Sequence, residues 1–239
     1  MNNLKQRENN SLRKFENGDL EKITNSVDDS AKLKNLENDL IEALKRFPYQ
    51  YDKPCGQKEG IRARNTSQIK NLIASVGTKY GLSAWATNLS SESNNRVHSP
   101  NCHIQNKEWM YDLILFSYDA NVDYAINHLW VVVESEWGAS TKSKNTGKII
   151  QYGEVKSDFQ KLLIANADIR ILIFRKIAYK DYELNKLFEF FKCRINKYSA
   201  NRDDAVFLFV CYGFKMEKNR TTFTLKKFYK GEFVDITKI

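Results

Sequence analysis

Apolar residues at four successive positions, Trp130-Val131-Val132-Val133, constrain the fold of this chain more than any other feature. A strand with one face in water alternates apolar and polar residues, so a strand without alternation is covered on both faces. Along the whole chain, apolar runs and helical periods predict elements in the order helix, strands, helix, strand, helix, strands. This order predicts an α/β fold, a mixed β-sheet flanked by helices on both faces.

The periodicity of apolar residues also predicts the elements and the domain organisation. Residues 1–30 are rich in Asn, Lys, Glu and Asp and predict a flexible or frayed helical N-terminal segment. Residues 31–239 form one predicted domain with an N-terminal helical extension. Helices are predicted over residues 31–48, 60–80, 148–166 and 182–198. Strands are predicted over residues 82–87, 97–104, 110–116, 128–137, 171–174, 206–211, 222–228 and 233–236, and a basic loop over 142–145.

Composition limits the classes of protein and partner. The net charge of +9 favours polyanionic partners, because lysine and arginine neutralise phosphates. No apolar run approaches the roughly 20 residues that cross a bilayer, and the N-terminus lacks the apolar middle of a secretory signal. The four cysteines are far apart, which is typical of a cytoplasmic protein. No glycine-rich loop of a nucleotide-binding site is present, so no nucleotide cofactor is expected.

Three carboxylates lie at the ends of two apolar runs. Asp112 precedes Leu113-Ile114-Leu115-Phe116, and Glu134 and Glu136 follow the valine run. Acids are rarely placed against buried apolar sequence unless they are paired or bind a metal. Alternate strand residues share a face, so Glu134 and Glu136 point the same way, with the Ser135 backbone carbonyl between them. If the strand after Asp112 lies alongside, these oxygens suit Mg²⁺ or Mn²⁺.

A second interpretation of the acids is structural. Glu134 and Glu136 would then be strand-end residues in water, and Asp112 would pair with a neighbouring lysine or arginine. The following helix favours the metal site, because Glu154, Asp158 and Lys161 recur there at i, i+4 and i+7 and form one polar stripe. Lys161 can lean over the strand ends and orient a water or stabilise charge on a phosphate. Its alternative is a solvated lysine paired with Asp158.

These residues resemble the PD-(D/E)xK nuclease superfamily, which has the restriction-endonuclease-like fold. Asp112, Glu134-Ser135-Glu136 and the helix around Asp158 and Lys161 carry the resemblance, which covers about residues 59–175. The family core is a helix, three strands, a helix and a strand, as predicted here. The resemblance implies a Mg²⁺-dependent (or Mn²⁺-dependent) endonuclease that hydrolyses phosphodiester bonds in DNA, with Asp112 as the first metal-binding acid and Glu134 as the second. Members that make double-strand cuts are mostly dimers, so a homodimer is a possible form.

The chain departs from the family motif at the lysine position, which Glu136 occupies. Some members with glutamate there are active, and Glu136 would hold a second metal or act as a base. Other members carry the lysine on the following helix, where Lys161, or else Lys156, is the candidate. Many members also have an assisting acid on the first core helix, for which Glu59 is the candidate; its alternative role is to interact with the helix dipole.

Basic residues near the predicted site suggest a phosphate-binding rim for DNA. They lie near the first core helix and after Glu136: Arg62, Arg64, Lys70, Lys142, Lys144 and Lys148. The absent strand lysine also leaves a second function open. In that case the chain has a nuclease-like fold that binds nucleic acid or a protein partner without cutting.

Overall fold

The structure of the chain is a computed structural model that describes residues 29–49, 61–87, 89, 104–106, 110–118, 126–138, 140–177, 181–198, 204–215 and 220–237. The chain divides into two units, residues 1–38 and 39–239. Most of the predicted flexible segment and most of the predicted strand 97–104 lie outside the described residues. A first helix spans residues 29–46.

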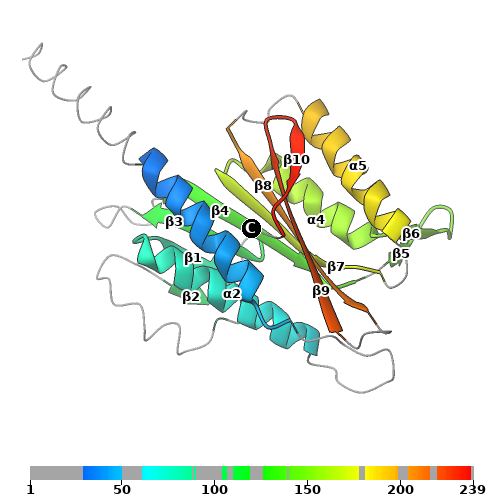
Figure 1. Ribbon diagram of the computed structural model, residues 1–239, viewed down its shortest axis with the longest axis horizontal. Coiled ribbons are helices and arrows are strands. Elements are labelled where there is room, and N and C mark those ends of the chain that lie inside the picture. Colours follow the sequence, from blue (N-terminus) through cyan, green and yellow to red (C-terminus); the bar gives the residue numbers. More distant parts are fainter. Residues whose placement is uncertain are drawn as a thin grey trace, which may run out of the picture. The chain divides into compact units, whose positions relative to one another are not determined.

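Among the described residues, the second unit contains an eight-stranded mixed sheet with the strand order β10-β9-β8-β7-β4-β3-β1-β2 (Figure 1). A separate two-stranded sheet is a hairpin of β5 and β6. The strands are β1 (Ser83–Ala86), β2 (Ile104–Asn106), β3 (Leu113–Tyr118), β4 (Ile126–Glu136), β5 (Ser140–Lys142), β6 (Ile149–Gln151), β7 (Ile169–Arg175), β8 (Val206–Lys215), β9 (Arg220–Tyr229) and β10 (Glu232–Asp235).

Helices connect the parallel strands in the middle of the sheet. β3 is antiparallel to both β1 and β4, whereas β4, β7 and β8 are parallel. Parallel neighbours need a crossover connection. The helices α4 (Gly153–Ile164) and α5 (Asp181–Lys197) supply it, and α2 (Ile61–Lys79) precedes β1. None of the described helices has the length and apolar content of a membrane-spanning helix.

Helices cover both faces of the sheet. Ile114 of β3 belongs to the core cluster that includes Phe159 of α4 and Phe191 of α5. The next residue, Leu115, points to the opposite face, because successive strand residues alternate. A Cβ atom at Gly77 of α2 would lie 2.7 Å from the Leu115 side chain, which places α2 on that second face. The predicted α/β fold with a mixed sheet is therefore confirmed.

The segment between β4 and α4 differs from the prediction. The predicted loop 142–145 forms the connection of the β5–β6 hairpin except for Lys142, which pairs with Ile149. The start of the predicted helix 148–166 instead forms β6. α4 begins later, at Gly153, because Tyr152 adopts the left-handed conformation with φ of 55°. The β-branched Ile149 and Ile150 favour a strand at this short segment.

We expect the Gly77→Ala substitution to destabilise the protein by about 1 kcal/mol. Alanine favours a helix by about 1 kcal/mol over glycine, but overpacking a core costs roughly 1–3 kcal/mol. Here the added methyl group would lie 2.7 and 2.8 Å from the two Cδ atoms of the fully buried Leu115. Urea denaturation measures the change, with Ser75→Ala on the exposed side of α2 as the control. A more stable Gly77→Ala variant would contradict this packing.

Candidate active site

Asp112 lies one position before β3 and is held by hydrogen bonds to β4. Its Oδ2 accepts a hydrogen bond from the Ser135 backbone N–H at 2.7 Å and from the Ser135 hydroxyl at 2.8 Å. Its Oδ1 accepts one from the Lys70 ammonium at 3.1 Å. These side-chain bonds replace strand pairing at this position, so β3 begins at Leu113 and not at residue 110 as predicted.

Lys70 of α2 is the buried partner of Asp112. Only 2% of Lys70 is exposed, and its ammonium also lies 3.3 Å from the Thr87 hydroxyl. The prediction that Lys70 belongs to an exposed phosphate-binding rim is therefore wrong. Lys70 lies between the buried residues Ile69 and Ile73, so its position on the apolar side of α2 was a signal in the sequence. The alternative interpretation, that Asp112 pairs with a lysine, describes this contact.

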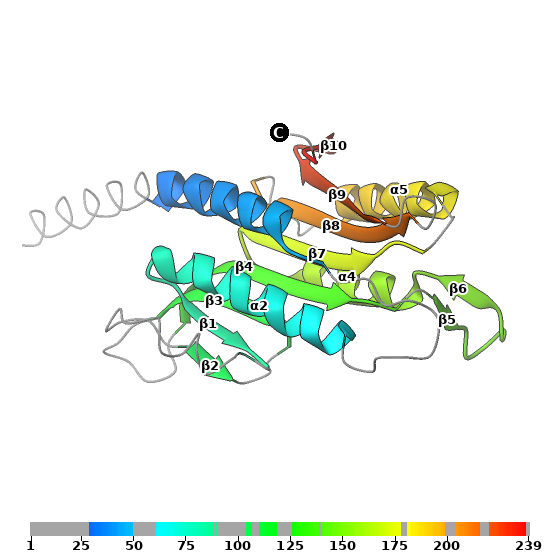
Figure 2. The same ribbon diagram turned by 60° about the horizontal axis from the view of Figure 1, so that its bottom comes forward.

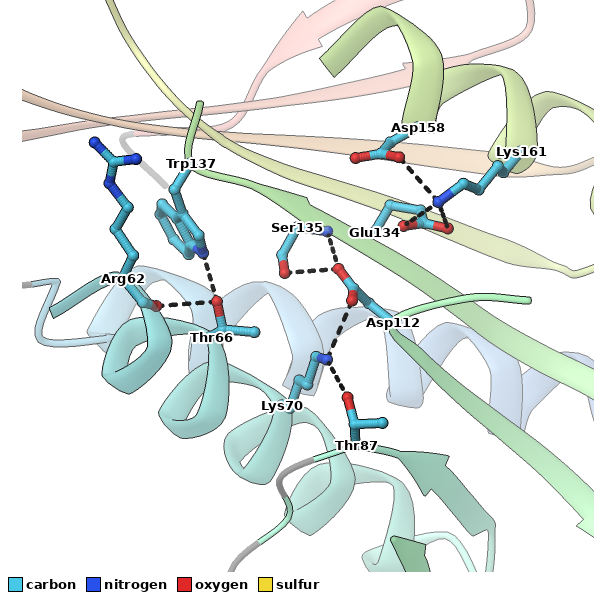
Figure 3. Close-up of polar contacts among 10 residues, drawn as sticks. All are labelled: Arg62, Thr66, Lys70, Thr87, Asp112, Glu134, Ser135, Trp137, Asp158 and Lys161. Carbon is cyan, nitrogen blue, oxygen red and sulfur yellow. Dashed lines mark hydrogen bonds and ion pairs between the residues drawn. The ribbon is translucent and has the colours of Figure 1, made fainter. Parts of the chain in front are cut away.

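Glu134 at the end of β4 is buried, with 2% of the residue exposed. It points toward α4, where the Lys161 ammonium lies 3.3 Å from both of its carboxylate oxygens (Figure 3). The contact to Oε2 has hydrogen-bond geometry, and the contact to Oε1 does not. Within the described part of the chain, Glu134 Oε1 is therefore buried without a hydrogen-bond partner. The interpretation of Glu134 as a strand-end residue in water is wrong.

The environment of Glu134 disfavours its charged form. Burial raises the pKa of the Glu134 carboxyl to about 8, and the nearby carboxylates of Asp112 and Asp158 act in the same direction. The Lys161 ammonium opposes this shift but does not reverse it. A buried acid whose pKa is raised by burial and by other acids is typical of functional sites.

Lys161 contacts two acids at once. Its ammonium lies 2.9 Å from Asp158 on the same helix and 3.3 Å from Glu134 on β4. Burial lowers the pKa of Lys161, but the hydrogen bond to Asp158 and the charge of Glu134 outweigh burial and raise it. The predicted contact with the strand end and the alternative pairing with Asp158 therefore both occur. The side chain of Lys161 remains 42% exposed, so it faces solvent as well as the acids.

Glu136 and Lys156 have different surroundings. Glu136 Oε1 accepts a hydrogen bond from the Gly138 N–H. Burial raises the pKa of Glu136 despite this bond, with further contributions from Asp158, Glu154 and Asp112. The Lys156 ammonium donates to the Gln151 carbonyl at 3.1 Å and lies over the Phe190 ring. Of the two candidate lysines on α4, Lys161 contacts the predicted metal-binding acid Glu134, whereas Lys156 bonds to the Gln151 carbonyl.

The residues present fit a divalent cation at Glu134 in one respect. A buried carboxylate oxygen without a hydrogen-bond partner, close to other acids, has the chemistry of a hard-cation ligand. In the part of the chain that the structure describes, no three Asp, Glu, His or Cys side chains gather closely enough to hold an ion. Asp112 and Glu134 have lysine partners on α2 and α4, which cover opposite faces of the sheet. Glu59, the predicted assisting acid, lies outside the described residues.

The remaining predicted contact residues lie in two groups. Arg62 and Arg64 are exposed in the first turns of α2, and Lys142, Lys144 and Lys148 are exposed on the β5–β6 hairpin. One contact that the sequence did not predict connects α2 to the end of β4. The Trp137 indole donates a hydrogen bond to the Thr66 hydroxyl at 2.7 Å.

Comparisons of the chain with protein-family models, with curated proteins and with solved structures found no match. The chemistry of the site is therefore inferred from its own side chains. These are three strand-end carboxylates, a fourth carboxylate on α4 and two lysines that approach from different helices.

Proposed function

We propose that the chain is a metal-dependent endonuclease of the PD-(D/E)xK type that hydrolyses phosphodiester bonds in DNA. The observation that carries this proposal is the buried Glu134 Oε1, which has no hydrogen-bond partner among the described residues and lies near the acids Asp112 and Asp158. A buried carboxylate oxygen without a hydrogen bond is costly, and a bound cation would relieve that cost. The net charge of +9 supports a polyanionic substrate.

The order and pairing of the elements also support the proposal. α2, β1, β3, β4, α4 and β7 follow one another as helix, three strands, helix and strand, once the short β2 and the hairpin are set aside. This is the element order of the PD-(D/E)xK core. Because β3 and β4 are neighbours with Leu113 opposite Val133, Asp112 and Glu134 come to the same end of the strand pair.

Each side chain has a role in the proposed reaction. Glu134 would hold Mg²⁺ or Mn²⁺ on the α4 side of the sheet. Asp112, which the Ser135 N–H and hydroxyl hold on the α2 side, would join it as a ligand by leaving Lys70 and turning past the end of β4. A bound divalent ion lowers the pKa of a ligated water and neutralises charge that develops on phosphate. Lys161 keeps its proton, because its pKa is raised, and presents a cation to a phosphate oxygen. Glu136, whose pKa is also raised, accepts a proton from the attacking water.

The test is cleavage of supercoiled plasmid DNA in Mg²⁺ or Mn²⁺. We expect Asp112→Asn and Glu134→Gln each to lower the cleavage rate roughly 1000-fold, since a metal supplies several kcal/mol and each 1.4 kcal/mol is about tenfold. Asp39→Asn is the matched control, because Asp39 is a surface acid paired with Lys79 at 3.7 Å. Cleavage that persists in both site variants would reject this site.

A second candidate function is a nuclease-like fold that binds nucleic acid or a protein partner without cutting. The pairing of Asp112 with Lys70 and of Glu134 with Lys161 favours it, since lysines then neutralise the acids in place of a metal. Calorimetric titration with Mg²⁺ and Mn²⁺ distinguishes the two functions. The absence of metal binding, with salt-dependent DNA binding retained, would favour the non-catalytic function.

A further inference from the structure

Along the sequence, the β5–β6 hairpin lies directly between β4 and α4, the two elements that carry Glu134 and Lys161. Residues 137–139 alone separate Glu136 of β4 from the start of β5, and Tyr152 alone separates β6 from α4. Figure 2 shows the hairpin extending past the end of β4, beside the start of α4. A ligand bound along the hairpin would therefore lie beside the strand end and the helix that carry Glu134 and Lys161.

The base of the hairpin is fixed to the domain. Tyr152 is buried, and its hydroxyl accepts a hydrogen bond from the Ile177 N–H at 2.9 Å. The Lys156 ammonium donates to the Gln151 carbonyl at 3.1 Å. Thr141 Oγ1 fills the space beside Gly153, where a Cβ atom would lie 2.0 Å away. These contacts fix the direction of the hairpin relative to α4.

The exposed part of the hairpin is basic and carries an uncovered apolar side chain. Lys142, Lys144 and Lys148 are exposed, and none of them forms an ion pair with a carboxylate in the described part of the chain. No Asp or Glu occurs in the sequence between Glu136 and Glu154. Ile149, which pairs with Lys142, is 65% exposed. Such a surface is complementary to a polyanion that also offers apolar contacts.

We propose that this hairpin inserts into the major groove of double-stranded DNA and holds the duplex beside the candidate active site. The inference rests on the proposed function and deepens it, because it names B-form duplex DNA as the substrate. The major groove is about 12 Å wide and admits a two-stranded β-ribbon. The deep, narrow major groove of duplex RNA does not admit side chains. Lys142, Lys144 and Lys148 contact phosphates at the groove edges, and Ile149 contacts the base edges.

The experiment measures binding of the full chain to a 20-base-pair DNA duplex in EDTA, where metal-dependent cleavage does not occur. Neutralising three phosphate contacts changes the slope of log affinity against log salt by about 2.7. We therefore expect the triple variant Lys142→Gln/Lys144→Gln/Lys148→Gln to bind roughly 100-fold more weakly at 0.15 M salt. The matched control replaces three lysines of α5, Lys186, Lys192 and Lys197, with glutamine. It carries the same change in net charge, and we expect its salt slope to stay as in the wild type.

Two further probes test the groove and the kind of partner. For single-stranded DNA, we expect the affinities of the wild type and of the hairpin variant to agree within about threefold. We expect the same for duplex RNA of the same sequence. An equal loss for all three nucleic acids, or an unchanged salt slope with duplex DNA, would overturn the inference. Sedimentation of Ile149→Ser is expected to match the wild type. Dissociation of a dimer in this variant would show that a second copy covers the hairpin, which would also overturn the inference.

The inference and the proposed function fail in different ways. Hairpin-dependent duplex binding without cleavage in Mg²⁺ or Mn²⁺ would reject the nuclease and leave the hairpin contact standing. If the protein cleaves DNA with the metal but its duplex binding does not respond to the hairpin substitutions, the hairpin contact is rejected and the nuclease proposal stands. Retained thermal unfolding temperatures of the variants would show that these surface changes leave the fold intact.

Discussion

Replacing Glu134 with glutamine is expected to stabilise the protein by roughly 3–5 kcal/mol at pH 9 and to leave its stability nearly unchanged at pH 5. Glu134 is 2% exposed, and burial raises its pKa from 4.5 to about 8. Below pH 4.5 the folded and unfolded states both carry the proton. Between pH 4.5 and pH 8 the unfolded state loses the proton and the folded state keeps it, so the wild type loses about 1.4 kcal/mol per pH unit.

Urea denaturation of both proteins between pH 5 and pH 9 measures this difference. Glutamine is nearly isosteric with the protonated acid and has no charge to bury, so the variant avoids the loss. Glu42→Gln is the control, because Glu42 is an exposed acid whose ion pairs with Lys45 and Arg46 lie at 3.6 and 3.4 Å on the surface. Its effect is expected to stay below about 1 kcal/mol at every pH. A difference between wild type and Glu134→Gln that does not change with pH would contradict the raised pKa.

The same pair of proteins connects stability to the proposed metal. If Glu134 binds Mg²⁺, the ion stabilises the wild type by RT ln(1 + [L]/Kd), which is about 2.7 kcal/mol at 100 times Kd. The Glu134→Gln variant is expected to gain far less. The Glu134→Gln variant would then be more stable than the metal-free wild type but inactive, because Glu134 Oε1, which has no hydrogen bond among the described residues, is the oxygen proposed to bind the metal.

Substituting Lys70 with methionine is expected to destabilise the protein by roughly 3 kcal/mol. Lys70 is 2% exposed and pairs with Asp112 at 3.1 Å, and removing one partner of a buried ion pair costs about 3–5 kcal/mol. The lower end of this range applies because the Asp112 side chain is 24% exposed and keeps its bonds to Ser135. Thermal and urea unfolding measure the effect.

A control and a second variant make this result specific. Lys79→Met removes a lysine from the same helix, but its pair with Asp39 at 3.7 Å is exposed, so a change below about 1 kcal/mol is expected. Adding Asp112→Asn to Lys70→Met removes the unpaired charge and still lets the side chain accept a bond from Ser135. The double variant is therefore expected to be more stable than Lys70→Met alone. Equal effects of Lys70→Met and Lys79→Met would show that Asp112 does not depend on a buried partner.

Local patterns predicted most of the elements. The unbroken apolar run Trp130–Val133 lies in a strand that is buried between helices, and α2 and α5 match the predicted helices within a residue or two at each end. The hairpin was missed because Lys148-Ile149-Ile150-Gln151 is too short for its periodicity to distinguish a strand from the first turn of a helix. The left-handed Tyr152, which ends the hairpin, has no signal in its residue type.

The sequence by itself determined that the acids lie at strand ends. Both the apolar runs and the charged residues that flank them are local properties of the chain. The tertiary structure decided which cation meets which acid. Lys70 and Asp112 are 42 residues apart, and Lys161 and Glu134 are 27 apart. Their pairing depends on which helix covers which face of the sheet. The same packing leaves Oε1 of Glu134 without a hydrogen bond among the described residues, since burial removes water and Lys161 is shared between Glu134 and Asp158.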